Sequence, residues 1–172
     1  MGIINIKYAL VIGLICAASV LGCGNDSASL IPTPDEPPIS SGPPTTSFNC
    51  TGCEAFSVGR VIDGDTLDLS DGARVRLYGI DTPERGEPCF TEATNRLRQL
   101  AGATVRLESG PRATDSFGRR LAYAYTDIGH SIDVILIGDG LAEAWTRDGQ
   151  HRDTLVALEQ SARENGAGCL WG

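Results

Sequence analysis

From residue 54 onward, apolar and polar residues alternate in short runs of the kind that form β-strands. The runs occupy residues 56–62, 66–69, 73–80, 104–108 and 120–126. Asp71-Gly72 separates the second run from the third, and this dipeptide is preferred in tight hairpin turns. The pattern therefore predicts five strands, the first three of which follow one another as a β-meander.

Three other segments have helical periodicity instead. We expect a helix over residues 92–101 capped by Thr91, a short helix that starts after Ser131 and ends before Gly138, and a last helix capped by Asp153. The residues expected to face the core are Ala93, Leu97, Leu100, Leu155, Leu158 and Ala162. Five short strands interleaved with about three helices predict a β-rich fold, an OB-type, five-stranded, partly open barrel, although strand count alone leaves other β-rich folds open.

The N-terminal part of the chain has a different composition. Residues 8–21 carry no charge, but this run is shorter than the roughly 20 residues that cross a bilayer, so we expect a signal peptide over residues 1–22. Val20-Leu21-Gly22-Cys23 resembles a bacterial lipobox, which makes Cys23 the candidate lipidation site. Residues 23–49 are rich in Pro, Ser and Thr and are expected to form a disordered tether to a domain at 50–172. The sequence therefore predicts an exported lipoprotein of the cell envelope, held to a membrane through Cys23, with an ordinary secreted protein as the alternative.

The cysteines after Cys23 are Cys50, Cys53, Cys89 and Cys169. An even number in an exported protein indicates disulfides, and four cysteines allow three pairings. We favour Cys50–Cys53 and Cys89–Cys169 as structural bridges, because neither a second CxxC motif nor a metal-site spacing of histidines accompanies Cys50-Thr51-Gly52-Cys53. The sequence itself does not fix the pairing.

Acidic residues at strand ends and turns are the first candidates for chemistry. Asp63, Asp65, Asp81 and Glu84 belong to two short motifs, and carboxylates that converge repel one another unless a cation lies among them. Oxygen ligands suit Ca²⁺ or Mg²⁺ better than zinc. Each motif alone is commonplace, since Asp-Gly-Asp at a strand end is most often a turn.

Two arginines from separate predicted strands, Arg76 and Arg119, are the second candidates. A guanidinium group is a planar fork that matches phosphate oxygens. Together with a hard cation and a carboxylate that deprotonates water, such arginines supply what phosphodiester cleavage needs. The net charge of −8 excludes a broad basic surface for nucleic acid but not a local basic cleft.

Taken in order, the blocks at 63–66, 76–84 and 118–119 resemble the thermonuclease family, the staphylococcal-nuclease-like OB-fold nucleases. Gly140-Leu141-Ala142 and the terminal Leu170-Trp171 match as well, so the resemblance covers about residues 56–171. Several matched blocks in the right order are a far stronger signal than any one of them.

The resemblance implies a Ca²⁺ site. Asp65 and Asp81 look like the direct ligands, together with the main-chain carbonyl of Thr82. Asp63 looks like an acid that acts on the ion through water. Ca²⁺ is thus the cofactor that the resemblance implies.

The resemblance also implies roles in catalysis. Glu84 looks like the general base for the attacking water, and Arg76 and Arg119 look like the pair that grips the phosphate and stabilises the transition state. The implied reaction is hydrolysis of DNA and/or RNA at the P–O5′ bond, which leaves 3′-phosphates. We expect the protein to act as a monomer.

Some positions depart from the family pattern. Residues 85–89 are short and lack the lysines of a long basic loop, Phe117 stands where a tyrosine often occurs, and Trp145 replaces a pair of tyrosines. A non-catalytic OB-type module that binds nucleic acid or another partner at the cell surface is therefore the alternative. In decayed modules of this family the acids or arginines are typically replaced, and here none is.

Overall fold

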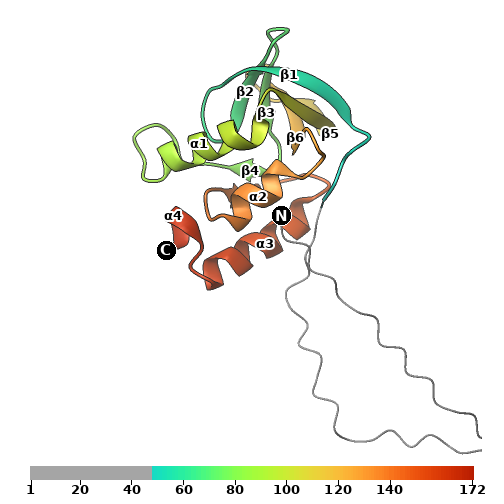
Figure 1. The fold of residues 1–172 in the computed structure, drawn as a ribbon. Helices are drawn as coiled ribbons and strands as arrows, with labels where there is room; N and C mark the ends of the chain where they lie inside the picture. Colours follow the sequence, from blue (N-terminus) through green and yellow to red (C-terminus); the bar gives the residue numbers. More distant parts are fainter. Residues whose placement is uncertain (1–47) are drawn as a thin grey trace, which may run out of the picture. The chain divides into compact units, whose positions relative to one another are not determined.

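The alternating runs of the sequence form a five-stranded β-barrel in the computed structural model, which describes residues 48–172 (Figure 1). The strands are β1 Glu54–Val61, β2 Thr66–Leu69, β3 Arg74–Leu77, β5 Thr104–Thr114 and β6 Arg120–Thr126. They close in the order β1-β2-β3-β6-β5, with β5 pairing with β1, and only the β3–β6 pair is parallel within this barrel. The prediction of a β-rich, OB-type, five-stranded barrel is confirmed, and the barrel is closed rather than partly open.

Four helices accompany the barrel within the described residues: α1 Phe90–Ala101, α2 Ile132–Gly138, α3 Arg152–Glu164 and α4 Gly168–Trp171. Figure 1 shows all of them on the same side of the barrel. The sequence predicts about three helices, and the fourth is a single turn too short to have a periodic pattern of its own. No helix in residues 48–172 has the length and hydrophobicity needed to cross a bilayer.

The predicted helix caps are partly right. Ser131 caps α2, since its side chain accepts a hydrogen bond from the Val134 amide at 3.2 Å. Thr91 and Asp153 lie inside α1 and α3, which begin one or two residues earlier, after Cys89 and His151. Cys89 has a left-handed backbone with φ of 69° and no side-chain cap bond, so a disulfide cysteine rather than a hydroxyl residue precedes α1.

The prediction of a single strand over residues 73–80 is wrong, because a break in the strand at Gly79 separates two strands. β3 ends at Leu77, and residues Ile80–Asp81 form a separate strand, β4, which pairs with β7, Glu143–Ala144. A Cβ atom on Gly79 would lie 2.5 Å from Cδ1 of Leu155 on α3, so a larger residue here would have to displace that side chain. The break turns Asp81 away from the barrel and toward the site described below.

One hydrophobic core joins the barrel to its helices. Leu67 of β2, Leu77 of β3, Leu97 of α1, Leu136 of α2 and Leu155 of α3 are each at most 1% exposed. Leu97 and Leu155 are on the faces predicted from the periodicity of the sequence. The helices therefore fix the end of the barrel from which β3 and β4 emerge.

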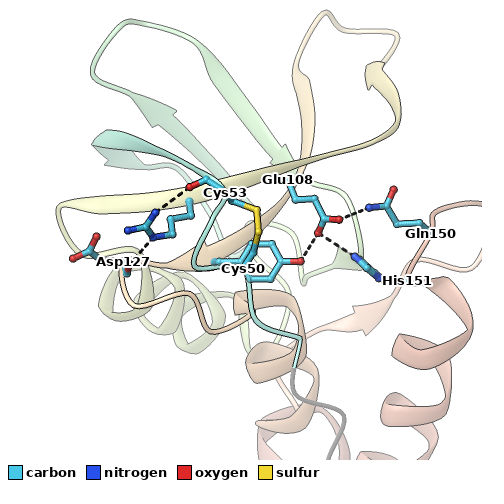
Figure 2. Close-up of a disulfide and its surroundings, with 8 residues drawn as sticks. Cys50, Cys53, Glu108, Asp127, Gln150 and His151 are labelled. Carbon is cyan, nitrogen blue, oxygen red and sulfur yellow. Dashed lines mark hydrogen bonds and ion pairs between the residues drawn. A yellow bond between two sulfur atoms is a disulfide. The ribbon is translucent and has the colours of Figure 1, made fainter.

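The structure joins Cys50 to Cys53 and Cys89 to Cys169, which is the pairing that the sequence favoured. Figure 2 shows the first bridge beside Glu108 of β5. The Glu108 carboxylate accepts hydrogen bonds from the Tyr125 hydroxyl and from Gln150 at 2.6 Å, and it lies 3.1 Å from Nε2 of His151. This cluster fastens the start of α3 to the barrel.

Candidate active site

The first part of the site is the turn between β1 and β2. Asp65 lies at its end with 5% exposure, and its amide donates to the Asp63 carboxylate at 3.2 Å. A Cβ atom on Gly64 would lie 2.6 Å from Oγ1 of Thr82, so glycine lets the segment after β4 pack directly on this turn. The two acidic motifs of the sequence meet here.

The Asp65 carboxylate is held by several donors. Its Oδ2 accepts hydrogen bonds from the amide and the hydroxyl of Thr82 at 3.0 and 2.9 Å, and its Oδ1 lies 3.0 Å from Nε of Arg76. Burial raises the pKa of Asp65 to about 6, opposed by the charge of Arg76 and by the Thr82 hydrogen bonds, while the negative charge of Asp63 raises it further. A buried carboxylate beside a second one is a place where a cation lowers the free energy.

Arg76, on β3, joins the two predicted metal ligands. Its Nη2 donates to Asp81 at 2.6 Å, and its Nη1 donates to the carbonyls of Leu77 and Ile80 at 2.6 and 2.7 Å. The Arg76 side chain is 11% exposed, whereas that of Asp81 is 58% exposed. Within residues 48–172 the structure brings no three acidic, histidine or cysteine side chains together as a metal cluster, so Arg76 holds the position between Asp65 and Asp81.

Arg119 enters from the loop between β5 and β6. Its Nε donates to Oδ2 of Asp115 at 2.6 Å, and its amide donates to Oδ1 of the same residue at 2.9 Å. Burial opposes ionisation of Asp115, but the hydrogen bonds from Arg119 and Phe117 outweigh it and lower its pKa. Gly118, with φ of 78°, allows the tight loop that brings Arg119 back onto its own acid. Asp115 has no role among the residues predicted from the sequence, although an aspartate three residues before a glycine is a common signal of such a turn.

Glu84 lies in an exposed turn after β4. Its amide donates to the Glu87 carboxylate at 2.7 Å, and the amide of Glu87 donates back to the Glu84 carbonyl at 2.9 Å. This reciprocal pair fixes the turn, while the Glu84 side chain lines the same cavity as Arg76 and Arg119. The three predicted catalytic side chains therefore share one cavity, although they come from three different parts of the chain.

This cavity, which we call the Trp145 hollow, has a volume of about 530 Å³. Beyond the three predicted residues it is lined by Tyr78, Arg112, Trp145 and Asp148, among others. Oδ1 of Asp148 accepts from Nε1 of Trp145 at 2.8 Å, and Arg112 donates to both Asp148 oxygens at 2.6 and 3.1 Å. The Arg112 hydrogen bond lowers the pKa of Asp148 to about 2. The Asp148 carboxylate thus stays charged and fixes the Trp145 ring at the wall of the cavity.

Two arginines and a carboxylate that line one cavity are groups that a nuclease, a phosphodiester hydrolase, can use. Comparison with known sequences agrees with this class. The sequence model of a family described as staphylococcal nuclease homologue matches residues 74–172, more than half of the chain. The chain therefore belongs to the family of staphylococcal nuclease homologues.

Individual relatives are similar over about two thirds of the chain. A thermonuclease of Staphylococcus intermedius is 35% identical over 123 residues, which are 64% of this chain and 71% of that protein. An uncharacterized endonuclease of Escherichia coli O157:H7 is 33% identical over 117 residues, 65% of this chain and 73% of its own length. A micrococcal nuclease of Shigella flexneri is 30% identical over 124 residues, 65% and 70% of the two chains.

Proposed function

We propose that this protein is a Ca²⁺-dependent nuclease that hydrolyses DNA and/or RNA and leaves 3′-phosphate ends. The observation that carries the proposal is the shared cavity, in which Arg76, Glu84 and Arg119 face one volume from three segments of the chain. A guanidinium on each side of a phosphate can neutralise the charge that develops on its oxygens.

The residues beside this cavity offer oxygen ligands, the type that a hard cation prefers, and a bound ion would take over the position that Arg76 holds between Asp65 and Asp81. Asp65, Asp81 and the carbonyl of Thr82 would hold Ca²⁺, and Asp63 would act through water. The buried position of Asp65 next to Asp63 supports this choice, because both burial and the second carboxylate disfavour its charge until a cation compensates it. When bound, the ion supplies positive charge to the phosphate oxygens.

The chain's own residues then carry the reaction. Arg76 and Arg119 bind the phosphate, and Arg76 exchanges part of its contact with Asp81 for the substrate oxygens. Glu84 takes a proton from the attacking water. The water oxygen bonds to phosphorus, the P–O5′ bond breaks, and the departing O5′ takes a proton from solvent, so that a 3′-phosphate and a free 5′-hydroxyl remain.

The experiment is incubation of the purified protein with single- and double-stranded DNA and with RNA, in Ca²⁺, in Mg²⁺ and in chelator. We expect cleavage in Ca²⁺ but not in Mg²⁺ or in chelator, and we expect the products to carry 3′-phosphate ends. We also expect Ca²⁺ to raise the melting temperature of the wild type and not of Asp65→Asn, since an ion that binds only the folded state stabilises it. A folded wild type that cleaves nothing would instead support a non-catalytic binding module.

We further propose that the protein is exported and anchored through a lipid on Cys23. This residue, the predicted signal peptide at 1–22 and most of the tether lie outside the described residues. Two or three acyl chains on one cysteine suffice for lasting attachment. Cys23→Ser should move the protein from the detergent phase to the aqueous phase on Triton X-114 partition. Equal partition of the two proteins would contradict the anchor.

A further inference from the structure

A second hollow borders the proposed catalytic residues, and Trp145 does not line it. We call it the Arg74 hollow; its volume is about 620 Å³. It is lined by Asp68, Gly72, Arg74, Glu84, Phe117, Gly118 and Arg119. Glu84, Phe117 and Arg119 also line the Trp145 hollow. The proposed catalytic residues thus lie where two hollows meet, and a ligand long enough can occupy both.

Two neighbouring strands line the Arg74 hollow through Asp68 of β2 and Arg74 of β3, and β1 pairs with β2 beside them. Arg60 of β1, Asp68 of β2 and Arg74 of β3 are paired across these strands in register. Asp68 accepts from Nε of Arg60 at 2.8 Å and from Nε and Nη2 of Arg74 at 2.7 and 3.1 Å. Two guanidinium groups therefore share one carboxylate, which leaves one positive charge in excess.

These arginines remain accessible to a ligand. The side chains of Arg60 and Arg74 are 68% and 46% exposed, while that of Asp68 is 16% exposed. The hydrogen bonds to Asp68 use only part of the five N–H donors that each guanidinium carries. Asp68 orients the guanidinium groups of both arginines, and their remaining N–H groups can bind an oxyanion.

The spacing along β3 matches a nucleic-acid backbone. Arg74 and Arg76 are two residues apart, so their side chains leave the same face of the strand about 7 Å from one another. This is close to the repeat of phosphates along an extended single strand. If Arg76 binds the scissile phosphate, Arg74 is placed to bind the next one.

Phe117 supplies a face for a base at the same place. Its side chain is 83% exposed, which is exceptional for a large apolar residue, and it forms part of the rim shared by the two hollows. Bases of any sequence stack on exposed aromatic rings. A phosphate-binding guanidinium and an exposed ring together are suited to one nucleotide of a flexible strand.

We propose that Arg74, oriented by Asp68, binds the phosphate next to the scissile one, so that a single-stranded polymer spans both hollows. This inference rests on the proposed nuclease function. Residues 85–89 contain no lysine, so they do not form a basic loop that could bind the polymer. In this proposal β3 binds it instead, through Arg74. Arg74 is a binding residue for the polymer and takes no part in bond breaking.

The test compares two substrates with the wild type and Arg74→Gln in the full-length protein. The dinucleotide TpT has one phosphodiester and no flanking phosphate, whereas a 20-residue oligothymidylate has flanking phosphates on both sides. We expect Arg74→Gln to raise KM for the 20-mer about 10-fold, as for a lost charge-assisted hydrogen bond. The same variant should hydrolyse TpT within about 2-fold of the wild type, which also shows that it is folded.

Arg152→Gln is the matched control. Arg152 is 44% exposed and pairs with Asp153 on α3, so the variant removes the same charge from another surface. An equal loss in this control would mean that overall charge causes the effect, and the proposal would be wrong. Equal losses on TpT and the 20-mer, or no loss on either, would also overturn it. A wild type that cleaves neither substrate would reject the nuclease function itself.

Discussion

Arg76 is the residue whose replacement affects both stability and chemistry. It is 11% exposed, and it contacts two carboxylates and two main-chain carbonyls. Arg119 is 30% exposed and contacts Asp115 on its own loop. The two arginines have the same proposed task but very different structural surroundings.

We therefore expect Arg76→Ala and Arg119→Ala to have similar effects on kcat/KM but different effects on the free energy of unfolding. Both should lower kcat/KM about 100-fold or more, because each removes a donor to the developing charge. Arg76→Ala should also lower the free energy of unfolding by about 3 kcal/mol or more, since it leaves the buried Asp65 without its cation, whereas Arg119→Ala should change it by less than about 1 kcal/mol. Urea unfolding and steady-state kinetics on DNA check both values. Normal turnover by Arg119→Ala would contradict its role.

Asp133 connects three elements that the sequence does not bring together. It lies in the first turn of α2 with 1% exposure, and its carboxylate accepts from the amides of Gly79 and Ala124 at 3.2 and 3.1 Å. The bond to Gly79 holds the break between β3 and β4, and the bond to Ala124 holds β6. A single buried carboxylate thus keeps β4 in the position that presents Asp81.

This carboxylate should make stability depend on pH. Burial raises the pKa of Asp133 from 3.8 to about 6, and the two amides and the charge of His151 oppose this only in part. Because the folded pKa is the higher one, ionisation is easier in the unfolded state, and the free energy of unfolding falls as the pH rises from about 4 to above 6.

Asp133→Asn does not titrate, so the difference between the two proteins isolates this group. The free energy of unfolding of the wild type minus that of the variant should decrease by about 2 kcal/mol between pH 4 and pH 7. Urea titrations at several pH values measure it. A difference that stays constant with pH would show that the carboxyl group ionises equally in both states.

Local sequence predicts those elements whose pattern and turn lie close together along the chain. The five strand positions and the Ser131 cap follow from alternation and from a hydroxyl before an apolar turn. The break at Gly79 does not, because the contacts of Gly79 are with Leu155 of α3 and Asp133 of α2, which are distant in the sequence. The start of α1 likewise depends on Cys89 and its distant disulfide partner rather than on a capping side chain.

The same distinction applies to the site. The acids and arginines stand in recognisable motifs, so the sequence could name them and the resemblance could assign them roles. The residues that hold these side chains in place could not be predicted from the sequence. Arg112 and Asp148 are 36 positions apart, and Asp68 is bonded by arginines of two other strands. Such contacts exist only after the barrel has closed.

At the scale of the whole molecule, the net charge is −8, but the charged residues that line the two hollows are equal in number for each sign. Their arginines are Arg74, Arg76, Arg112, Arg119 and Arg147, and their acids are Asp68, Asp81, Glu84, Asp115 and Asp148. The lining of the two hollows is therefore balanced in charge, and long-range attraction contributes little to the capture of a polyanion. In the proposed function, phosphates would bind by replacing carboxylates as partners of these arginines at short range.

The bridge between Cys89 and Cys169 spans 80 positions and links the start of α1 to α4. In the chain-entropy account a loop of this length stabilises the fold by about 4 to 5 kcal/mol. The Cys89→Ser, Cys169→Ser double variant should lose a stability of this order in urea unfolding, measured against Cys50→Ser, Cys53→Ser, whose loop spans 3 positions. Equal losses in the two variants would contradict the entropic origin.

This long bridge also determines what a single proteolytic cut would do. The exposed loop at 115–118 lies between Cys89 and Cys169 along the chain, and loop tips of this kind are preferred cleavage sites. A cut there would give one fragment with Asp65, Arg76 and Glu84 and another with Arg119, still joined through sulfur. In denaturing gel electrophoresis the cleaved protein would run as one band without reductant and as two bands with it. The residues that line the two hollows would all stay on one molecule.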